Sequence, residues 1–209
     1  MINTNLIVFY IIASYLLGAI PTGYIAGYVY KRIDIREYGS KNIGFTNVLR
    51  VLGTVPSVVV LICDIAKGFV PVFLCKYIFK NQTNDFVLIA VGIATIVGHN
   101  WTVFLNFNGG KGVNTSVGVW LAIEPRAILI VLFIWALVLY LTRYMSLSNV
   151  VASILLSILI FFFSSSPVII IFAIITMLLV IYRHKENIQR LLKNEERKIG
   201  EKIELDAKK

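Results

Sequence analysis

The residues best suited to chemistry in this chain surround a glycine-rich segment near its middle. Gly109, Gly110 and Gly112 flank a single lysine, Lys111. Backbone N–H groups of such a loop can point into one concavity that suits an anion, and the lysine adds a full positive charge. A helix beginning near Val113 would direct its positive end to the same place. We therefore expect a phosphate site, and a flexible hairpin with a topogenic lysine is the alternative.

A second polar segment precedes the first long apolar stretch of the middle of the chain. It interleaves glycines with neutral hydrogen-bond donors and ends in an arginine, with the candidate residues Gly39, Ser40, Asn42, Thr46, Asn47 and Arg50. If the chain is helical from Thr46, then Thr46, Asn47 and Arg50 share one helix face. Arg50 can bind a phosphate through two parallel hydrogen bonds. Capping of the following helix explains the same residues, and the two roles are compatible.

Three further places carry polar side chains beside apolar helices. His99 could act as a general base, as a substrate-binding donor or as a buried packing histidine. Ser146 and Asn149 open an apolar helix and could cap it or bind substrate. His184 and Asn187 recur at helical spacing in an amphipathic segment, which we expect to lie on the membrane surface with its basic residues toward anionic headgroups.

The remaining ionisable and thiol groups point to structure rather than to a metal. Asp64 and Lys67 share a helix face inside an apolar segment, where they form either a structural ion pair or part of the site, and we assign neither a catalytic role. Cys63 and Cys75 have apolar neighbours and read as small core residues. The two histidines and two cysteines have no zinc-ligand spacing, so we expect no metal and no cofactor.

Composition places the chain in a membrane. Of its 209 residues 58% are hydrophobic and the mean hydropathy is +0.82, well above the 45–50% apolar content that is typical of soluble domains. The net charge of +9 does not indicate nucleic-acid binding, because Lys and Arg collect on the cytoplasmic side of bilayer proteins. The first residues lack a basic region, so no cleaved signal peptide is expected.

Seven apolar segments are candidate membrane crossings. They are Leu6–Tyr30, Val51–Phe79, Phe86–Phe104, Val113–Ile123, Ala127–Leu141, Asn149–Phe163 and Pro167–Tyr182. Pro21 is expected to kink the first of them. Val113–Ile123 is the uncertain one, since eleven helical residues rise only about 16 Å and a hydrocarbon core is about 30 Å thick.

Charge parity decides whether the short segment crosses. Lys31–Arg50 carries five basic residues and the stretch from Arg183 to the end carries nine, so both should be cytoplasmic. The glycine loop then also lies inside, and an even number of crossings must separate it from the tail. Val113–Ile123 must therefore cross. The prediction is an all-α integral membrane protein with seven transmembrane helices, its N-terminus outside and its C-terminus cytoplasmic.

This topology gathers the polar segments on one face of the membrane. They are Lys31–Arg50, Asn106–Gly112, Arg143–Asn149 and His184–Asn194. Residues 1–183 are expected to form the membrane bundle and residues 184–209 a cytoplasmic tail, of which 184–194 contributes to the site. A solvated charged tail is expected for Glu195–Lys209.

Three motifs in this order resemble a known family. They are Gly39-Ser40-x-Asn42-x-Gly44-x-Thr46-Asn47-x-x-Arg50, Gly98-His99 leading to Phe104-x-x-Phe107-x-Gly109-Gly110-Lys111-Gly112-Val113, and His184-x-x-Asn187-Ile188-x-Arg190-Leu191. The chain is similar, from about Ser14 to Lys198, to the bacterial acyl-phosphate:glycerol-3-phosphate acyltransferases of the PlsY type. It departs from their usual pattern at Lys41, Phe45, Asn149 and Asn194.

The resemblance implies an enzyme of the bacterial inner membrane that performs the first step of phospholipid synthesis. It would transfer an acyl group from acyl-phosphate to the 1-hydroxyl of glycerol-3-phosphate, giving lysophosphatidate and inorganic phosphate. By resemblance, Ser40, Arg50, Lys111 and Asn187 hold the glycerol phosphate and hydroxyls, while Gly109, Gly110, Gly112, Asn42 and Thr46 cradle the acyl-phosphate. His99 and His184 would orient substrates or relay a proton. The predicted catalytic residues are thus Ser40, Arg50, His99, Lys111, His184 and Asn187, and Gly39, Asn47, Ser146 and Asn149 complete the substrate-binding set.

The implied partners are acyl-phosphate, glycerol-3-phosphate, membrane lipid and an acyltransferase that produces acyl-phosphate; nucleic acid is not among them. Two other classes of protein compete with this interpretation. A transporter of phosphate-bearing anions would need anion-binding groups accessible from both faces, and the prediction places them on one. A scaffold that holds anionic lipid gives no reason for the uncharged Asn42, Asn47 and Asn187.

Overall fold

The computed structural model describes residues 4–79 and 84–201, and all regular secondary structure in these ranges is helical. The elements are α1 (Thr4–Ala19), α2 (Thr22–Lys31), η1 (Ile35–Glu37), α3 (Phe45–Leu52), α4 (Thr54–Ile78), α5 (Asp85–Asn100), η2 (Val103–Leu105), α6 (Val113–Ile123), α7 (Pro125–Thr142), α8 (Met145–Phe163), α9 (Pro167–Arg183) and α10 (Lys185–Leu192). The predicted all-helical fold is confirmed.

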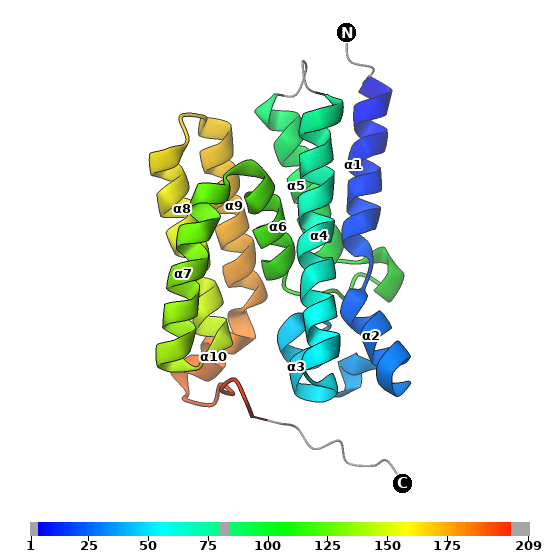
Figure 1. Ribbon diagram of the computed structural model, residues 1–209, viewed down its shortest axis with the longest axis vertical. Helices are drawn as coiled ribbons and strands as arrows, with labels where there is room; N and C mark the ends of the chain where they lie inside the picture. Colours follow the sequence, from blue (N-terminus) through cyan, green and yellow to red (C-terminus); the bar gives the residue numbers. More distant parts are fainter. Residues whose placement is uncertain (1–3, 80–83, 202–209) are drawn as a thin grey trace.

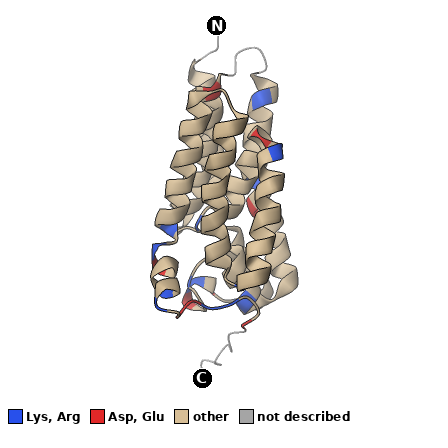
Figure 2. Cartoon of the chain, turned by 90° about the vertical axis from the view of Figure 1, so that its left-hand side faces the viewer, with Lys and Arg blue, Asp and Glu red and all other residues tan. Residues whose placement is uncertain are grey.

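The long helices form an elongated bundle in which α1 begins at one tip and the described part of the chain ends at the other (Figure 1). The short elements α2, α3 and α10 gather at the tip where the chain ends, which we call the C-terminal tip. Figure 2 shows that many of the charged residues also collect there, whereas the middle of the bundle carries few. The C-terminal tip is thus the polar end of an otherwise apolar bundle.

Proline and glycine set two of the helix boundaries. The first apolar segment breaks between Ala19 and Thr22, at Pro21, as predicted. The second segment was predicted to begin at Val51, but the chain forms a separate helix, α3, and then turns at Gly53 with φ +92°. A glycine tolerates this backbone angle where other residues are strained. The long helix α4 therefore begins at Thr54, and α3 is a separate helix whose polar face need not follow the direction of α4.

Close packing and a capping lysine explain the short helix α6. Modelling a Cβ at Gly68 of α4 would place it 2.1 Å from the Thr115 carbonyl oxygen, and one at Gly118 would lie 2.0 Å from that of Ile65. These glycines let the two backbones approach, as small residues do in membrane helix pairs. Lys76 of α4 donates to the carbonyl of Ala122 at 2.6 Å. The lysine satisfies an unpaired carbonyl at the end of α6.

Within the described residues, five helical segments are long and apolar enough to cross a membrane, and α9 with α10, bent by 60°, is a sixth candidate. The helix α6 begins at Val113 as predicted, but its eleven residues leave it below that length. The protein is an all-helical integral membrane protein. The count of seven crossings and the direction of insertion remain predictions.

Candidate active site

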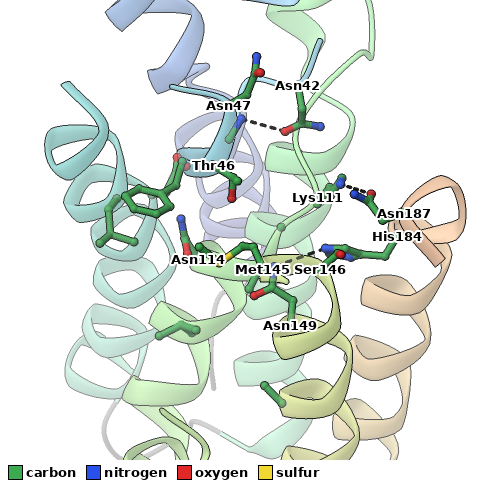
Figure 3. Close-up of a pocket in the computed structure, with 18 of the residues that line it drawn as sticks. Asn42, Thr46, Asn47, Lys111, Asn114, Met145, Ser146, Asn149, His184 and Asn187 are labelled. Atoms are coloured by element: carbon green, nitrogen blue, oxygen red, sulfur yellow. Dashed lines mark hydrogen bonds between the residues drawn. The ribbon is translucent and has the colours of Figure 1, made fainter. Parts of the chain in front are cut away.

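A cavity of about 290 Å³ opens among the elements of the C-terminal tip. Its polar wall is built from Ser40, Asn42, Thr46, Asn47, Arg50, Asp64, His99, Lys111, Asn114, Ser146, Asn149, His184, Asn187 and Glu196. Its apolar wall includes Leu61, Ile65, Val113, Val117, Val131, Leu132, Trp135 and Ala152. Figure 3 shows labelled side chains from separate segments facing the same space. The cavity can therefore receive a molecule with a charged end and an apolar end.

Most of the predicted site residues line this one cavity. All six predicted catalytic residues do so, together with Asn42, Thr46, Asn47, Gly112, Ser146 and Asn149. Gly39, Gly109 and Gly110 do not belong to its wall. The structure thus brings together segments that are far apart in the chain, as in the hydrogen bond between Arg50 and the carbonyl of Arg197, which are 147 positions apart.

The expectation that the N–H groups of Gly109 and Gly110 point into an open concavity is wrong. The Gly109 N–H donates to the Asn100 carbonyl at 3.2 Å, and the Gly110 N–H donates to the His99 carbonyl at 3.0 Å. A Cβ at Gly110 would lie only 2.0 Å from Nε2 of His99. These glycines are needed for close packing on the end of α5, and their amides are not free to bind a ligand.

Arg183 holds the glycine loop (residues 109–112) by its carbonyl groups, whereas the end of α5 holds it by its N–H groups. Its Nη2 donates to the Gly110 carbonyl at 2.6 Å and to the Gly109 carbonyl at 3.0 Å, and its guanidinium lies 5.4 Å from the Trp101 ring centre. The sequence offered no signal for this role, because Arg183 looks like the first charge of a tail. These hydrogen bonds hold Lys111 and the first turn of α6 at the cavity wall, where Gly112, Val113 and Asn114 lie.

Asn47 organises the loop before α3. Its Oδ1 accepts from the Ser40 N–H at 2.8 Å, and its Nδ2 donates to the carbonyls of Tyr38 and Ile35 at 3.1 and 3.2 Å. Since the amide is engaged at both ends by backbone, Asn47 positions Ser40 at the cavity and has little left for a ligand. Asn42 likewise accepts from the Gly44 N–H at 2.8 Å, which leaves its Nδ2 available.

Lys111 lies against the start of the tail helix. Its Nζ donates to Oδ1 of Asn187 (Figure 3). Nδ2 of Asn187 in turn donates to Glu196 at 2.6 Å. Burial lowers the pKa of Lys111 to about 8. For Glu196, burial raises the pKa, but the hydrogen bonds from Asn187 and Arg190 outweigh this effect and the net shift is downward. The cluster therefore holds a charged lysine and a charged carboxylate at neutral pH.

A chain of hydrogen bonds fixes the ring of His184. Its Nδ1 lies 2.8 Å from the Val180 carbonyl, which can only accept, so Nδ1 carries the proton. The unprotonated Nε2 then accepts from Nδ2 of Asn149 at 3.4 Å, and Trp135 donates to Oδ1 of Asn149 at 2.8 Å. Trp135 is a site residue that the sequence did not single out.

His99 is packed rather than openly presented. It is 4% exposed, and its Nδ1 lies 3.6 Å from Oδ1 of Asp64, too far for a hydrogen bond. Asp64 accepts instead from Lys67 at 2.8 Å and from Thr22 at 2.6 Å. The ion pair is buried, and Asp64 also belongs to the cavity wall.

The tail does not remain in solvent along its whole length, contrary to prediction. Glu196 lines the cavity, and the Arg197 carbonyl accepts from Nη2 of Arg50 at 3.1 Å. The Ile199 N–H donates to the Arg143 carbonyl at 2.8 Å. The expectation of a solvated tail is therefore wrong for Glu196 and Ile199, whereas Arg197 and Lys198 are exposed. Residues 202–209 lie outside the described ranges.

Several buried polar atoms of the cavity wall have no hydrogen-bond partner within the described part of the chain. They are Nε of Arg50, Oδ2 of Asp64 and Nδ1 of His99. Unpaired buried polar atoms are rare in folded proteins because each costs desolvation energy. A polar ligand with several donors and acceptors would satisfy them.

Known proteins match this chain over most of its length. The model of the family described as glycerol-3-phosphate acyltransferase matches residues 8–194. A glycerol-3-phosphate acyltransferase of Fusobacterium nucleatum is 44% identical over 189 residues, covering 90% of this chain and 96% of the relative. One of Thermoanaerobacter pseudethanolicus is 44% identical over 194 residues, covering 93% and 96%.

The chain belongs to the glycerol-3-phosphate acyltransferase family.

The fold agrees with crystal structures from this family. PlsY, described as an integral membrane glycerol 3-phosphate acyltransferase, matches in its glycerol 3-phosphate form with a TM-score of 0.86 and 36% identity. That match covers 93% of this chain and 96% of PlsY. The lysophosphatidic acid form matches with a TM-score of 0.85, also at 36% identity. The predicted resemblance to the PlsY type is confirmed.

Two departures from the expected pattern of this acyltransferase family have a backbone explanation. Lys41 and Asn194 stand where the resembled motifs usually carry glycine, and both have φ +57°. Glycine reaches this left-handed region without strain, asparagine does so more readily than most residues, and lysine does so at a cost. The backbone shape is thus kept although the glycine is not.

Proposed function

We propose that this acyltransferase moves an acyl group from acyl-phosphate to the 1-hydroxyl of glycerol-3-phosphate, with lysophosphatidate and inorganic phosphate as products. One observation carries the proposal. Inside the family fold, a single cavity joins a cationic and amide-rich wall, with Arg50, Lys111 and Asn187, to an apolar wall that runs toward Val131 and Trp135. Both proposed substrates carry a phosphate, and one also carries an acyl chain.

The cavity can accommodate the two phosphates in different ways. Arg50 offers a planar fork of donors for one phosphate, and its Nε is buried without a partner among the described residues. The first turn of α6 offers the positive end of a helix for the other, while Lys111 and Asn187 join Arg50 at the phosphate of glycerol-3-phosphate, as the resemblance implies. Both of these anion-binding sets belong to the cavity wall, as two phosphate-bearing substrates require.

We propose direct attack of the glycerol hydroxyl oxygen on the acyl carbon. The new ester C–O bond forms, the bond from the acyl carbon to the phosphate oxygen breaks, and phosphate leaves with the bonding electrons. The hydroxyl proton passes to a phosphate oxygen, whose second pKa near 6 suits it to accept. Orientation and charge stabilisation then supply most of the catalysis, and neither histidine is required as a base.

In this proposal the C-terminal tip faces the cytoplasm of a bacterial inner membrane. The tip carries the basic segments before α3 and after α9, and basic segments mark the cytoplasmic side. Soluble glycerol-3-phosphate would enter from this side, and the acyl chain would lie against the apolar wall. The acyltransferase that makes acyl-phosphate is the partner that such a substrate implies.

The donor is tested with purified protein in detergent or lipid. Palmitoyl-phosphate, palmitoyl-CoA and palmitoyl-acyl carrier protein are each supplied with glycerol-3-phosphate, and lysophosphatidate is measured. We expect product from palmitoyl-phosphate alone. Product only from a thioester would keep the acyltransferase and refute the donor, and no product from any donor in folded protein would favour transport of phosphate-bearing anions.

A further inference from the structure

The end of the described chain folds back across the cavity. After α10, the Glu195 N–H donates to the Arg190 carbonyl at 2.8 Å. Four residues later Ile199 is tied to Arg143 by two hydrogen bonds, one from its N–H at 2.8 Å and one to its carbonyl from Nη2 of Arg143 at 3.0 Å. The segment between is therefore fixed at both ends, with Glu196 directed into the cavity wall.

The Glu196 carboxylate is well bound. Its side chain is 7% exposed, and its oxygens accept from Nδ2 of Asn187 at 2.6 Å and from Nε of Arg190 at 2.8 Å. Asn187 in turn accepts from Lys111. One residue on, the Arg197 carbonyl takes up Nη2 of Arg50. The tail thus engages Arg50 and Asn187 directly and Lys111 through Asn187.

These are the donors that the proposed function gives to glycerol-3-phosphate. A carboxylate and a phosphate both accept charge-assisted hydrogen bonds, so they compete for the same donors. Two anions at hydrogen-bond distance from one cluster also repel each other in a buried site. Glu196 lies beyond residue 194, where the match to the family model ends.

We propose that Glu196 is a tethered competitor that occupies the anion site of the free enzyme and leaves when a phosphate monoester binds. This inference rests on the proposed function of the cavity. Glu196 would set the affinity for glycerol-3-phosphate and weaken the binding of inorganic phosphate, the released product. A substrate that also makes hydroxyl contacts displaces the carboxylate more readily than phosphate alone does.

Glu196 could instead stay in place and accept hydrogen bonds from the glycerol hydroxyls. That role predicts the opposite sign on removal of the carboxylate. A competitor is lost in Glu196→Gln, so glycerol-3-phosphate should bind more tightly, whereas a hydroxyl acceptor is weakened by the same change, so it should bind less tightly.

The first test compares Glu196→Gln with Glu195→Gln, its exposed neighbour, at pH 7 and low salt. The KM for glycerol-3-phosphate and the inhibition constant for inorganic phosphate are measured. We expect both to fall about tenfold in Glu196→Gln, which corresponds to about 1.4 kcal/mol, and to stay unchanged in Glu195→Gln. An unchanged or higher KM in Glu196→Gln would overturn the proposal.

The second test uses the unmodified protein and so does not depend on the folding of a variant. Tryptic cleavage at Arg197 and Lys198 is followed by mass spectrometry with and without saturating glycerol-3-phosphate or inorganic phosphate. We expect several-fold faster cleavage with either anion, and unchanged or slower cleavage would overturn the proposal. Faster cleavage without any acyl transfer would refute the proposed function but support Glu196 as a competitor. Acyl transfer without faster cleavage of the tail would support the proposed function but refute Glu196 as a competitor.

Discussion

Nδ2 of Asn149 lies 3.4 Å from Nε2 of His184, and the orientation of this amide is fixed by the hydrogen bond that Trp135 donates to its oxygen. The amide therefore presents its donor end to the imidazole. Only an unprotonated Nε2 can accept it. Asn149, one of the positions that depart from the family pattern, thus donates to a neutral His184, whose pKa is lowered to about 4 chiefly by burial.

Replacing this amide by a carboxylate should reverse its effect. In Asn149→Asp a carboxylate beside Nε2 favours the protonated imidazole, so the pKa of His184 rises. We expect the acidic limb of the pH profile of kcat/KM to move to higher pH. Trp135→Phe, which removes only the donor to Asn149, should leave the limb in place and lower kcat/KM several-fold. If the acidic limb of the kcat/KM profile does not move in Asn149→Asp, the contact between residue 149 and His184 does not control the pKa of His184.

Lys111 predicts an alkaline limb in the same profile. Burial lowers its pKa to about 8, so the ammonium is present below that pH and lost as pH rises through it. Because kcat/KM reports groups of the free enzyme, we expect it to fall with an apparent pKa of about 8. Lys111→Arg keeps its charge to much higher pH, so its alkaline limb should disappear while kcat/KM is lower at pH 7. If the parent and Lys111→Arg show the same alkaline limb, that limb does not report the titration of Lys111.

The sequence predicted the helices and the gathering of the site better than it predicted individual hydrogen bonds. The apolar residues from Val113 to Ile123 are neighbours in the sequence, so Val113 was correctly predicted to begin a helix. All six predicted catalytic residues line one cavity, because the motifs lie at the ends of helices that share the C-terminal tip. Helix boundaries and the position of a motif at a helix end can both be predicted from short stretches of the sequence.

What could not be predicted depends on contacts between distant segments. The Gly109 amide is bonded to Asn100, and Arg183 holds the loop 73 positions earlier through the Gly110 carbonyl. Glu196 looks like any charge of a solvated tail until Asn187 and Arg190 are seen beside it. Local patterns contain no information about which distant group will reach a given donor.

The buried ion pair of α4 should be needed for folding and not for chemistry. In Asp64→Asn the Lys67 ammonium has only neutral acceptors left, namely the Ile20 carbonyl at 2.9 Å and the amide of the new side chain. Breaking a buried pair from one side costs about 3–5 kcal/mol, which is roughly 10 °C in melting temperature for a chain of this size. Asp64→Asn with Lys67→Met removes both charges and should restore most of the loss. Equal melting temperatures for the single variant and the parent would refute this account.

Gly68 tests the packing that positions the first turn of α6. In Gly68→Ala the new methyl group meets the Thr115 carbonyl oxygen, 2.1 Å away in the unrelaxed structure, so α6 must shift. We expect a loss of about 1–3 kcal/mol in stability and a lower kcat, because Lys111 and Asn114 move with the helix. Cys63→Ala changes an exposed position of the same helix and serves as the control. If Gly68→Ala is destabilised but its kcat is unchanged, the packing of α4 on α6 does not position the site residues.

The central claim is that acyl-phosphate is cleaved in this cavity by transfer to a glycerol-3-phosphate hydroxyl and not by water. The most direct measurement follows phosphate release from palmitoyl-phosphate and lysophosphatidate formation in the same reaction. We predict one lysophosphatidate for each phosphate, and no phosphate without glycerol-3-phosphate. Phosphate released at the same rate without glycerol-3-phosphate, or in excess over lysophosphatidate, would contradict it.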